Sequence, residues 1–354
     1  MNAASTVRSP WSLARDDWAH HLADEPRYRL DQLWRGLYVD GAAPTDITTL
    51  PRGLRDRLTD VAQPALTEQR LQSGDDGGTI KWLWALPDGA AIETVLMHYD
   101  ERSTVCISSQ AGCAMACGFC ATGQGGYTRN LDVGEILEQV VAARATAAPR
   151  RLSNVVFMGM GEPFANYDRV LEAIHRLLGD FGLGARHITV STIGLVPQIL
   201  RFAEEGLQVG LAVSLHSAND HDRSELIPVN RRHPLDDLVA ACELYRERTG
   251  RRVTFEWAMI DGVNDRPRDA DELIGVASRA GAHVNLIPLN PTPGWPTVGS
   301  RPEVIADFAR RLTRGGVNAT VRANRGTDID AACGQLAARD DHGTGPTPVE
   351  LRRT

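Results

Sequence analysis

The sequence predicts an α/β protein: a partial TIM-like barrel of about six βα units, preceded by a small N-terminal helical domain and a short β extension. Continuous apolar stretches alternate with amphipathic ones, which is typical of a parallel sheet covered by helices. Six units are too few for the usual eight-unit barrel, so an open doubly wound sheet is the alternative. Polar residues cluster where the strand candidates end. This favours the barrel, because ligands bind at the carboxyl ends of parallel strands.

The elements of the barrel follow from the period of the apolar residues. Strands are expected at 104–108, 154–160, 187–192, 209–215, 253–260 and 283–289. Amphipathic stretches between them predict helices, among them 133–144, 167–178 and 235–248. Further strand patterns within 79–109, separated by turn residues, predict a small antiparallel unit that leads into the barrel.

The chain is expected to divide into five parts. These are a disordered start (1–10), a helical domain (11–78), the β extension (79–100), the barrel with the last cysteine segment (101–338) and a disordered tail (339–354). In the helical domain, apolar residues such as Leu30, Leu33 and Leu37 fall on one helix face.

Composition limits the class of protein. The chain has 354 residues, 42% apolar and 23% charged, and no apolar run approaches the roughly 20 residues that span a bilayer. Without an apolar signal core at the N-terminus, a cytoplasmic location away from membranes is expected. The net charge of −7 argues against a general nucleic-acid binder. Lys81 is the only lysine among 38 basic residues, and six arginines within 301–325 allow a local basic face.

Three cysteines, Cys113, Cys117 and Cys120, lie in one short run of small residues. Thiolates at this density favour an iron–sulfur cluster or zinc. A structural zinc site normally needs four protein ligands, and this run supplies three. A four-iron cluster held by three cysteines keeps one iron open, where a substrate or cofactor can bind.

Residues at the ends of the strand candidates could form the rim of a binding site. Gly161 allows close backbone approach to a ligand, and Glu162 can accept hydrogen bonds from an ammonium group. Taken singly, these residues are as well explained as capping or solvated groups. Together with Gly161 and Glu162, the expected rim comprises Ser191, Ser214, Leu215, His216 and Asn290.

The order of the motifs resembles one known family. Val105-Cys106-Ile-Ser-Ser-Gln-Ala-Gly-Cys113 is followed by Met158-Gly-Met-Gly161-Glu162-Pro163, Ser191-Thr-Ile-Gly, Ser214-Leu-His and Asp328-Ile-Asp-Ala-Ala-Cys333-Gly-Gln. Over about residues 25–340 this order resembles the RlmN/Cfr family of radical S-adenosylmethionine (SAM) rRNA adenine methyltransferases. The helical N-terminal segment is more similar to the carbon-2 branch. The resemblance implies a radical SAM barrel, a [4Fe-4S] cluster on Cys113, Cys117 and Cys120, and SAM bound at the open iron and the rim.

The resemblance also implies roles for residues outside the cluster motif. Cys333 would take a methyl group from one SAM, and a deoxyadenosyl radical from a second SAM would then activate that methyl group. The resulting methylene radical would add to the electron-poor carbon 2, giving a transient protein–RNA adduct. Glu93 would accept the ring proton, and Cys106 would resolve the adduct by forming a disulfide with Cys333. From the residues alone, Cys106 is expected in the core and Glu93 on an exposed strand.

The implied substrates are an adenosine of 23S rRNA in the peptidyl transferase centre and adenosine 37 of tRNA, with the helical domain as an RNA-binding accessory. An electron donor such as flavodoxin and a monomeric state are also expected. One alternative is a Cfr-like carbon-8 methyltransferase that confers antibiotic resistance. Another is a non-catalytic iron–sulfur or zinc protein that acts as an RNA-binding scaffold.

Overall fold

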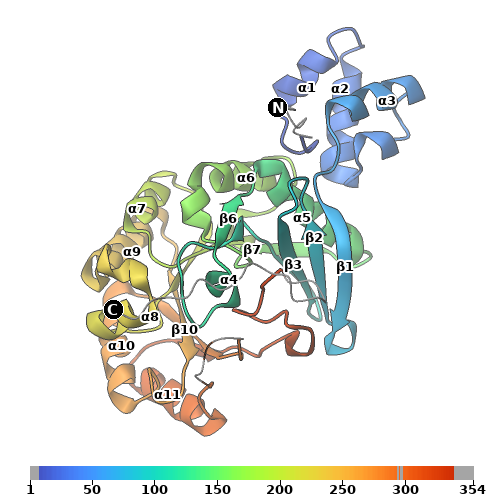
Figure 1. The fold of residues 1–354 in the computed structure, drawn as a ribbon. Helices are drawn as coiled ribbons and strands as arrows, with labels where there is room; N and C mark the ends of the chain where they lie inside the picture. Colours follow the sequence, from blue (N-terminus) through green and yellow to red (C-terminus); the bar gives the residue numbers. More distant parts are fainter. Residues whose placement is uncertain (1–7, 293–294, 296–297, 339–354) are drawn as a thin grey trace, which may run out of the picture.

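The computed structural model describes residues 8–292, 295 and 298–338 (Figure 1). Ten strands form one sheet in the order β1-β2-β3-β4-β7-β8-β9-β10-β11-β12. Its parallel part contains β4 (Ser103–Cys106), β7 (Leu152–Phe157), β8 (Ile188–Thr192), β9 (Gly210–Ser214), β10 (Thr254–Met259), β11 (His283–Pro288) and β12 (Ala319–Val321). The predicted α/β class is therefore confirmed.

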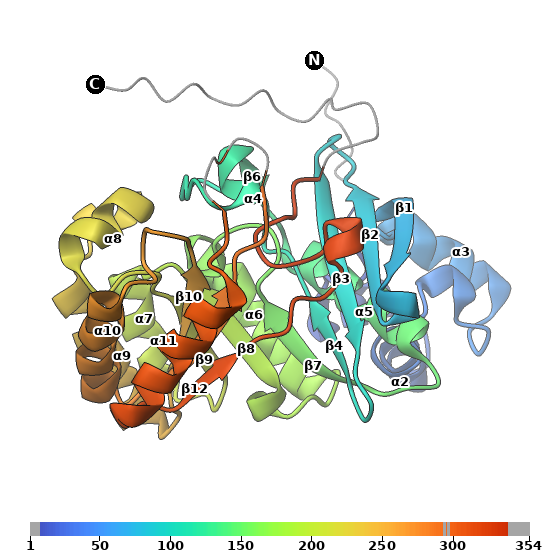
Figure 2. The ribbon, with the colours of Figure 1, turned by 90° about the horizontal axis from the view of Figure 1, so that it is seen from below.

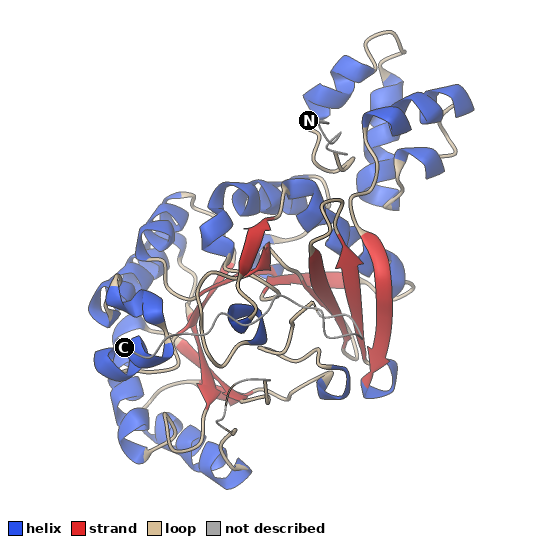
Figure 3. Cartoon of the chain, viewed as in Figure 1, coloured by secondary structure: helices blue, strands red, loops and turns tan. Residues whose placement is uncertain are grey.

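Helices cover the outer side of the parallel strands, as Figures 1 and 3 show. They are α5 (Val133–Ala147), α6 (Tyr167–Gly179), α7 (Val196–Glu204), α8 (Asp220–Leu226), α9 (Leu235–Thr249), α10 (Pro267–Ala280) and α11 (Pro302–Arg314). The parallel strands neighbour one another in chain order, with a helical connection between each pair. A doubly wound sheet would reverse the strand order at a switch point, so that alternative is wrong and the partial barrel is correct.

Helix α5 shows how the sequence fixes one element and the strand end beside it. Asp132 caps its N-terminus by accepting the backbone N–H of Glu135 at 2.9 Å, and Glu135 reciprocates at the Asp132 N–H. Gln139 is fully buried, accepts the N–H of Ser108 (2.8 Å) and donates to the Ser108 carbonyl (3.0 Å). These bonds fix the chain just after β4, where the cysteine loop begins.

The N-terminal helices α1 (Arg15–His21), α2 (Tyr28–Arg35) and α3 (Arg52–Val61) stand beside the barrel (Figure 1). The expected boundary at residue 78 is wrong, because β1 (Thr67–Gly74) follows soon after α3. Its sequence, TEQRLQSG, has no alternation of apolar residues, and its strand conformation depends on antiparallel pairing with β2. Only tertiary contacts reveal such an edge strand.

The β extension has the predicted strands β2 (Thr79–Ala85) and β3 (Ala91–His98). They form no separate sheet, because β3 pairs antiparallel with β4 and places Val95 opposite Cys106. A second, two-stranded sheet contains β5 (Gln110–Gly112) and β6 (Tyr127–Asn130), and the short helix α4 (Ala121–Gln124) lies between these two strands in the sequence.

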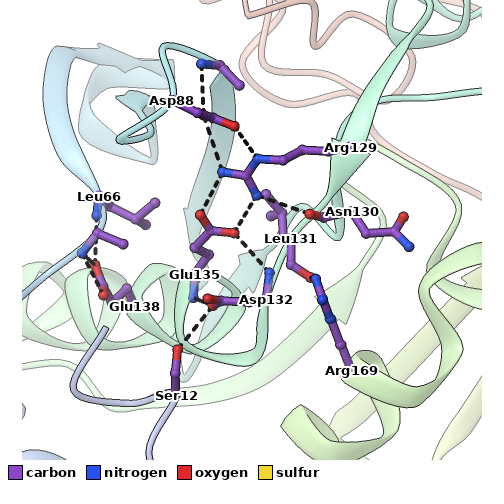
Figure 4. A network of polar contacts seen from close by, with 12 residues as sticks. Ser12, Leu66, Asp88, Arg129, Asn130, Leu131, Asp132, Glu135, Glu138 and Arg169 are labelled. Atoms are coloured by element: carbon purple, nitrogen blue, oxygen red, sulfur yellow. Dashed lines mark hydrogen bonds and ion pairs between the residues drawn. The ribbon is translucent and has the colours of Figure 1, made fainter. Parts of the chain in front are cut away.

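Polar contacts join the N-terminal part to the barrel (Figure 4). The buried carboxylate of Glu138 on α5 accepts the backbone N–H groups of Ala65 and Leu66 at 2.9–3.0 Å. Burial raises the pKa of Glu138 to about 7, although these backbone donors act in the opposite direction. The linker after α3 is thus attached to the barrel through backbone groups.

The expected disorder at the two ends is largely outside the described residues, which leave out 1–7 and 339–354. Residues 8–10 are placed, however, and Ser9 is fully buried. Among the described residues, no helix has both the length and the apolar character needed to cross a membrane.

Candidate active site

Two adjoining cavities lie at the carboxyl ends of the barrel strands. The first, here called the cysteine cavity, brings together most of the sequence-predicted site residues: Cys113, Cys117, Cys120, Gly161, Glu162, Ser191, Ser214, His216, Asn290 and Cys333. The second cavity, of about 320 Å³, is lined by residues of β3, β4 and β7 and by the chain after β12. Cys120 and Cys333 line both cavities, and Cys106 lines only the second.

The three clustered cysteines lie on one tight loop between β5 and α4. The Cys113 N–H donates to the Gly126 carbonyl at 2.6 Å, and the Cys120 N–H donates to the Cys117 carbonyl at 3.1 Å. A side chain at Gly123 would place its Cβ 2.9 Å from the Cys117 carbonyl oxygen. Glycine at position 123 therefore lets α4 pack against the backbone of the cysteine loop.

Glu162 closes the turn after β7 and connects it to β8. One carboxylate oxygen accepts the Phe164 N–H at 3.0 Å and the other accepts the Ile193 N–H at 2.8 Å. Burial raises the pKa of Glu162 to about 7, although both N–H groups act in the opposite direction. Gly161 has φ +98°, and a Cβ there would lie 2.5 Å from the Gln110 side chain, so only glycine fits.

The predicted rim is only partly assembled from side chains. Ser191 and Ser214 line the cysteine cavity at the ends of β8 and β9. Leu215 is fully buried and is absent from the cavity wall among the described residues, so the position of its side chain does not support the predicted contact with SAM. The strand-end pattern cannot distinguish a residue that faces the mouth from its neighbour that faces the core.

His216 is held as a neutral ring in the cavity wall. It has φ +56°, and its Nδ1 accepts the backbone N–H of Ala258 at 2.9 Å, which leaves the proton on Nε2. Burial, and next the charge of Arg223, lower its pKa to about 3. His216 is therefore a hydrogen-bond donor toward the cavity at neutral pH, not a cation.

Arg223 on α8 connects the ends of two strands beneath the cavity. Its fully buried guanidinium donates to the carbonyls of Ile193 (2.7 Å), Ser214 (3.2 Å) and Leu215 (3.1 Å), and to Oδ1 of Asn230 (2.5 Å). Burial lowers its pKa to about 10. The sequence analysis missed this residue, because an arginine within a polar helix gives no sign of burial.

The segment that carries Cys333 is bonded directly to the cysteine loop and to the end of β11. The Cys333 carbonyl accepts Nδ2 of Asn290 at 3.1 Å, and the Gly334 carbonyl accepts the N–H of Ala121 at 2.7 Å. Oδ1 of Asn290 in turn accepts Nδ2 of Asn324 at 2.7 Å. Asn290 thus lines the cysteine cavity as predicted, but its side-chain amide holds the Cys333 segment.

All six cysteines are free thiols in the structure, including the predicted disulfide partners Cys106 and Cys333. Burial, and next the proximity of Cys333, raise the pKa of Cys106 to about 12. The Cys333 side chain is exposed to the two cavities. The surrounding protein nevertheless desolvates the thiol and so raises its pKa. Arg322 acts in the opposite direction on both thiols.

Comparisons with known proteins agree with this arrangement. Residues 107–274 match the family model of the Radical SAM superfamily. The chain is 52% identical over 331 residues to a probable dual-specificity RNA methyltransferase RlmN of Salinispora tropica, covering 89% of this chain and 88% of the relative. A relative of the same name from Chloroflexus aurantiacus is 50% identical over 331 residues, with the same two coverages. The chain belongs to the RlmN family.

A solved relative shows how far the RlmN fold extends along this chain. The crystal structure of a radical SAM methyltransferase from Sphaerobacter thermophilus is 49% identical and superposes with a TM-score of 0.91. The superposition covers 94% of this chain and 100% of the solved Sphaerobacter chain. The helical domain, the β extension and the barrel therefore recur together in a radical SAM methyltransferase.

Radical SAM membership implies a [4Fe-4S] cluster and SAM, and the donor set fits them. All three cysteines of the loop line one cavity. Across the described part of the chain, no three His, Cys, Asp or Glu side chains converge on a point where a single metal ion would bind. Three cysteine ligands in one cavity match the ligand number of a four-iron cluster with one open iron, whereas a structural zinc site normally has four protein ligands.

Glu93 is brought near the Cys333 segment but lines neither cavity among the described residues. Alone in the sequence it resembles an exposed strand residue, yet it is only 2% exposed. Oε1 pairs with Lys81 Nζ at 3.0 Å, and Oε2 accepts the N–H groups of Ala337 (2.8 Å) and Ala338 (3.2 Å). Its role as proton acceptor remains a prediction.

Two further charged residues were missed in the wall of the cysteine cavity. Glu256 is buried in β10, accepts Nδ2 of Asn285 at 3.0 Å and lies 3.5 Å from Arg322, and burial raises its pKa. A carboxylate inside the apolar run VTFEWAMI is a signal that could have identified it. Arg322 lines both cavities and follows β12, a strand that the apolar pattern did not predict.

Proposed function

We propose that this protein methylates carbon 2 of an adenosine in RNA, with Cys333 as the methyl carrier and Cys106 as the resolving thiol. The observation that carries the proposal is the position of Cys333, which lines both the cysteine cavity and the second cavity. A sulfur there can receive a methyl group from one side and present it to a base on the other. The RNA methyltransferase names of the relatives support the same substrate class.

The cysteine cavity would hold the two cofactors. Cys113, Cys117 and Cys120 would bind the [4Fe-4S] cluster, while Glu162, Ser191, Ser214 and His216 would contact SAM. When bound, the cluster and SAM supply a methyl group and one-electron chemistry at carbon. Glu162 accepts two backbone N–H groups and the Thr192 side chain, which leaves one of the carboxylate's four lone-pair sites for an ammonium group.

Cys333 must act as a thiolate to accept a methyl group by displacement. Arg322 lowers the pKa of this thiol against the opposing effects of burial and Glu256. Asn290 holds the Cys333 carbonyl and thereby fixes the backbone from which the sulfur projects. Asn290 thus orients the segment that carries the nucleophile, while Arg322 offsets part of the rise in the pKa of the thiol that burial and Glu256 cause.

The second cavity would take the adenine, since its volume of about 320 Å³ reaches the lower end of the usual range for ligand sites. Cys106 lies in its wall, opposite Val95 in the sheet. After the base has been joined to the Cys333 methylene carbon, the adduct would give up one electron to the one-electron acceptor that the cluster supplies and its ring proton to Glu93, and the Cys106 thiolate would then attack the Cys333 sulfur. The S–S bond would form as the sulfur–methylene bond breaks, and the released carbon would take a proton to become the new methyl group.

The finer partners belong to the same proposal: 23S rRNA and tRNA as substrates, the N-terminal helices as an RNA-binding accessory, a flavodoxin-like electron donor and a monomeric enzyme.

The basic stretch 301–325 is less positive than its sequence suggests. Arg310 pairs with Asp307, and Arg311 pairs with Asp271 at 2.5 Å. Arg325, by contrast, donates to a backbone carbonyl and has no carboxylate partner among the described residues.

Methylation of an adenine-containing RNA fragment by the anaerobically reconstituted enzyme tests the proposal. We expect 2-methyladenosine in the nucleoside digest of the product. Cys333→Ala should give none, and Cys106→Ala should leave protein covalently joined to RNA. Cys242→Ala is the matched control, because Cys242 is buried in α9 and lines neither cavity.

Two results would contradict the proposal. A digest that contains only 8-methyladenosine would favour the Cfr-like carbon-8 reaction. Full activity of the Cys333→Ala variant would exclude the methyl-carrier role and leave the scaffold alternative.

A further inference from the structure

The chain after β12 is bonded to the β extension at several successive points. Figure 2 shows this segment passing beside β2 on its way from β12. The Gly326 N–H donates to the Asp75 carboxylate at 2.8 Å, and the Asp75 N–H donates to Asp328 at 3.2 Å. Further along, Lys81 Nζ donates to the Asp330 carbonyl at 3.2 Å. The extension is therefore the surface on which the Cys333 segment rests.

One buried ion pair holds both ends of the stretch that contains Cys333. Lys81 on β2 and Glu93 on β3 are 3.0 Å apart, with side chains only 6% and 3% exposed. Lys81 holds Asp330, three residues before Cys333. Glu93 holds Ala337 and Ala338, four and five residues after it.

The identity of Lys81 strengthens this observation. It is the only lysine in the chain, whereas every other basic side chain of the Lys/Arg type is arginine. A buried ammonium group is costly unless paired and hydrogen-bonded, and Lys81 has one carboxylate and one carbonyl partner. A compact ammonium group with separately directed donors suits two partners in different directions, unlike a planar guanidinium.

We infer that Lys81 is a positioning residue that fixes Cys333 between the two cavities and orients the Glu93 carboxylate. This inference rests on the proposed function, in which Cys333 carries the methyl group and Glu93 accepts a proton. Lys81 contacts neither cavity among the described residues and acts through Asp330 and Glu93.

The same contacts suggest an order of events during the reaction. Oε2 of Glu93 is occupied by the N–H groups of Ala337 and Ala338. Oε2 can accept a proton from RNA only after these bonds are exchanged, whereas Oε1 keeps a lone pair beside Lys81. Proton transfer to Oε2 would thus release the far end of the Cys333 segment while Lys81 keeps the near end and the carboxylate in place.

The test compares Lys81→Met and Lys81→Arg with wild type, as full-length enzyme reconstituted with cluster and SAM. Arg129→Met is the control for loss of another partly buried ion pair, with Asp88 and Glu135. Amide hydrogen exchange at Ala337 and Ala338 reports the anchoring. The fraction of Cys333 that carries a methyl group, measured by mass spectrometry before RNA is added, reports the position of the sulfur.

We expect Lys81→Met to speed hydrogen exchange at the Ala337 and Ala338 amides by about tenfold or more. Loss of the cation beside Glu93 should weaken the hydrogen bonds that these amides donate to its carboxylate. The fraction of Cys333 that is methylated should fall in the Lys81→Met variant. The Lys81→Arg variant should keep part of the wild-type amide protection and part of the wild-type methylation of Cys333. In Arg129→Met both should remain as in wild type. Unchanged amide exchange and unchanged Cys333 methylation in Lys81→Met would overturn the inference.

Two measurements keep the outcome clear. If the Lys81→Met variant does not fold, labelling of the wild-type protein with an amine-reactive reagent replaces it, because Lys81 and the N-terminal amine are the only amines that can react. Lys81 should be protected from the reagent. Reaction of Lys81 at the rate of a free amine would contradict its buried position. If wild-type Cys333 is never methylated although both amides are protected and Lys81→Met exposes them, the proposed function fails and the anchoring stands.

Discussion

Glu162 provides a test of the cavity's electrostatics in which stability should depend on pH. Burial raises the pKa of this carboxyl from an ordinary 4.5 to about 7. Between these values the folded chain binds more protons at Glu162 than the unfolded chain does. The free energy of unfolding therefore falls as pH rises through this window, and the loss is complete above pH 7.

The magnitude follows from the two pKa values. Between pH 5 and pH 8, Glu162 should remove about 2.5 kcal/mol from the free energy of unfolding. The variant Glu162→Gln has no such titration. It also replaces one of the two carboxylate acceptors by an NH2 group, so that the N–H of Phe164 or Ile193 loses its partner at a cost of about 1–3 kcal/mol.

Urea unfolding followed by tryptophan fluorescence, at pH 5, 6, 7 and 8, measures the difference between wild type and Glu162→Gln. The variant should be clearly less stable at pH 5, and the gap should narrow by about 2.5 kcal/mol by pH 8 or reverse. The difference in stability between wild type and Glu138→Gln should narrow in the same way, because burial also raises the pKa of Glu138, on helix α5, to about 7. A gap for Glu162→Gln that stays constant with pH would refute the reasoning.

Other substitutions test the geometry. Gly161→Ala should lower stability by about 1–3 kcal/mol and impair SAM binding, because φ is +98° and the new Cβ would lie 2.5 Å from the Gln110 side chain. Thermal unfolding measures the loss of stability. Gly275→Ala, in α10 with nothing within 4 Å, should raise stability by up to about 1 kcal/mol, and a loss would contradict it. Arg223→Met should cost about 3–5 kcal/mol in urea unfolding by leaving buried acceptors unpaired, and a neutral result would argue against the buried network. Since its pKa is about 3, His216 should show no imidazole titration between pH 5 and 8 by NMR.

The sequence by itself determined the elements and the cysteine loop. Strand candidates such as 209–215 and 283–289 coincide with β9 and β11 to within one residue at each end, because β9 has a buried apolar run at its centre and β11 alternates buried Val284 and Leu286 with partly exposed residues. The spacing of Cys113, Cys117 and Cys120 indicated one loop directly, because ligands so close in sequence cannot be far apart in space. The family motifs then predicted that Cys333 is the methyl carrier.

Only the tertiary structure decided which groups meet across the chain. Periodicity does not detect β1, because its strand conformation depends on β2 rather than on its own residues. Neither does it show that Leu215 faces the core, since a one-residue step at a strand end turns the side chain to the other face. Above all, Lys81 and Glu93 are separated from Asp330 and Ala337 by more than two hundred positions. Each residue is ordinary in its local sequence, and only the fold buries the ion pair against the segment that carries the reactive sulfur.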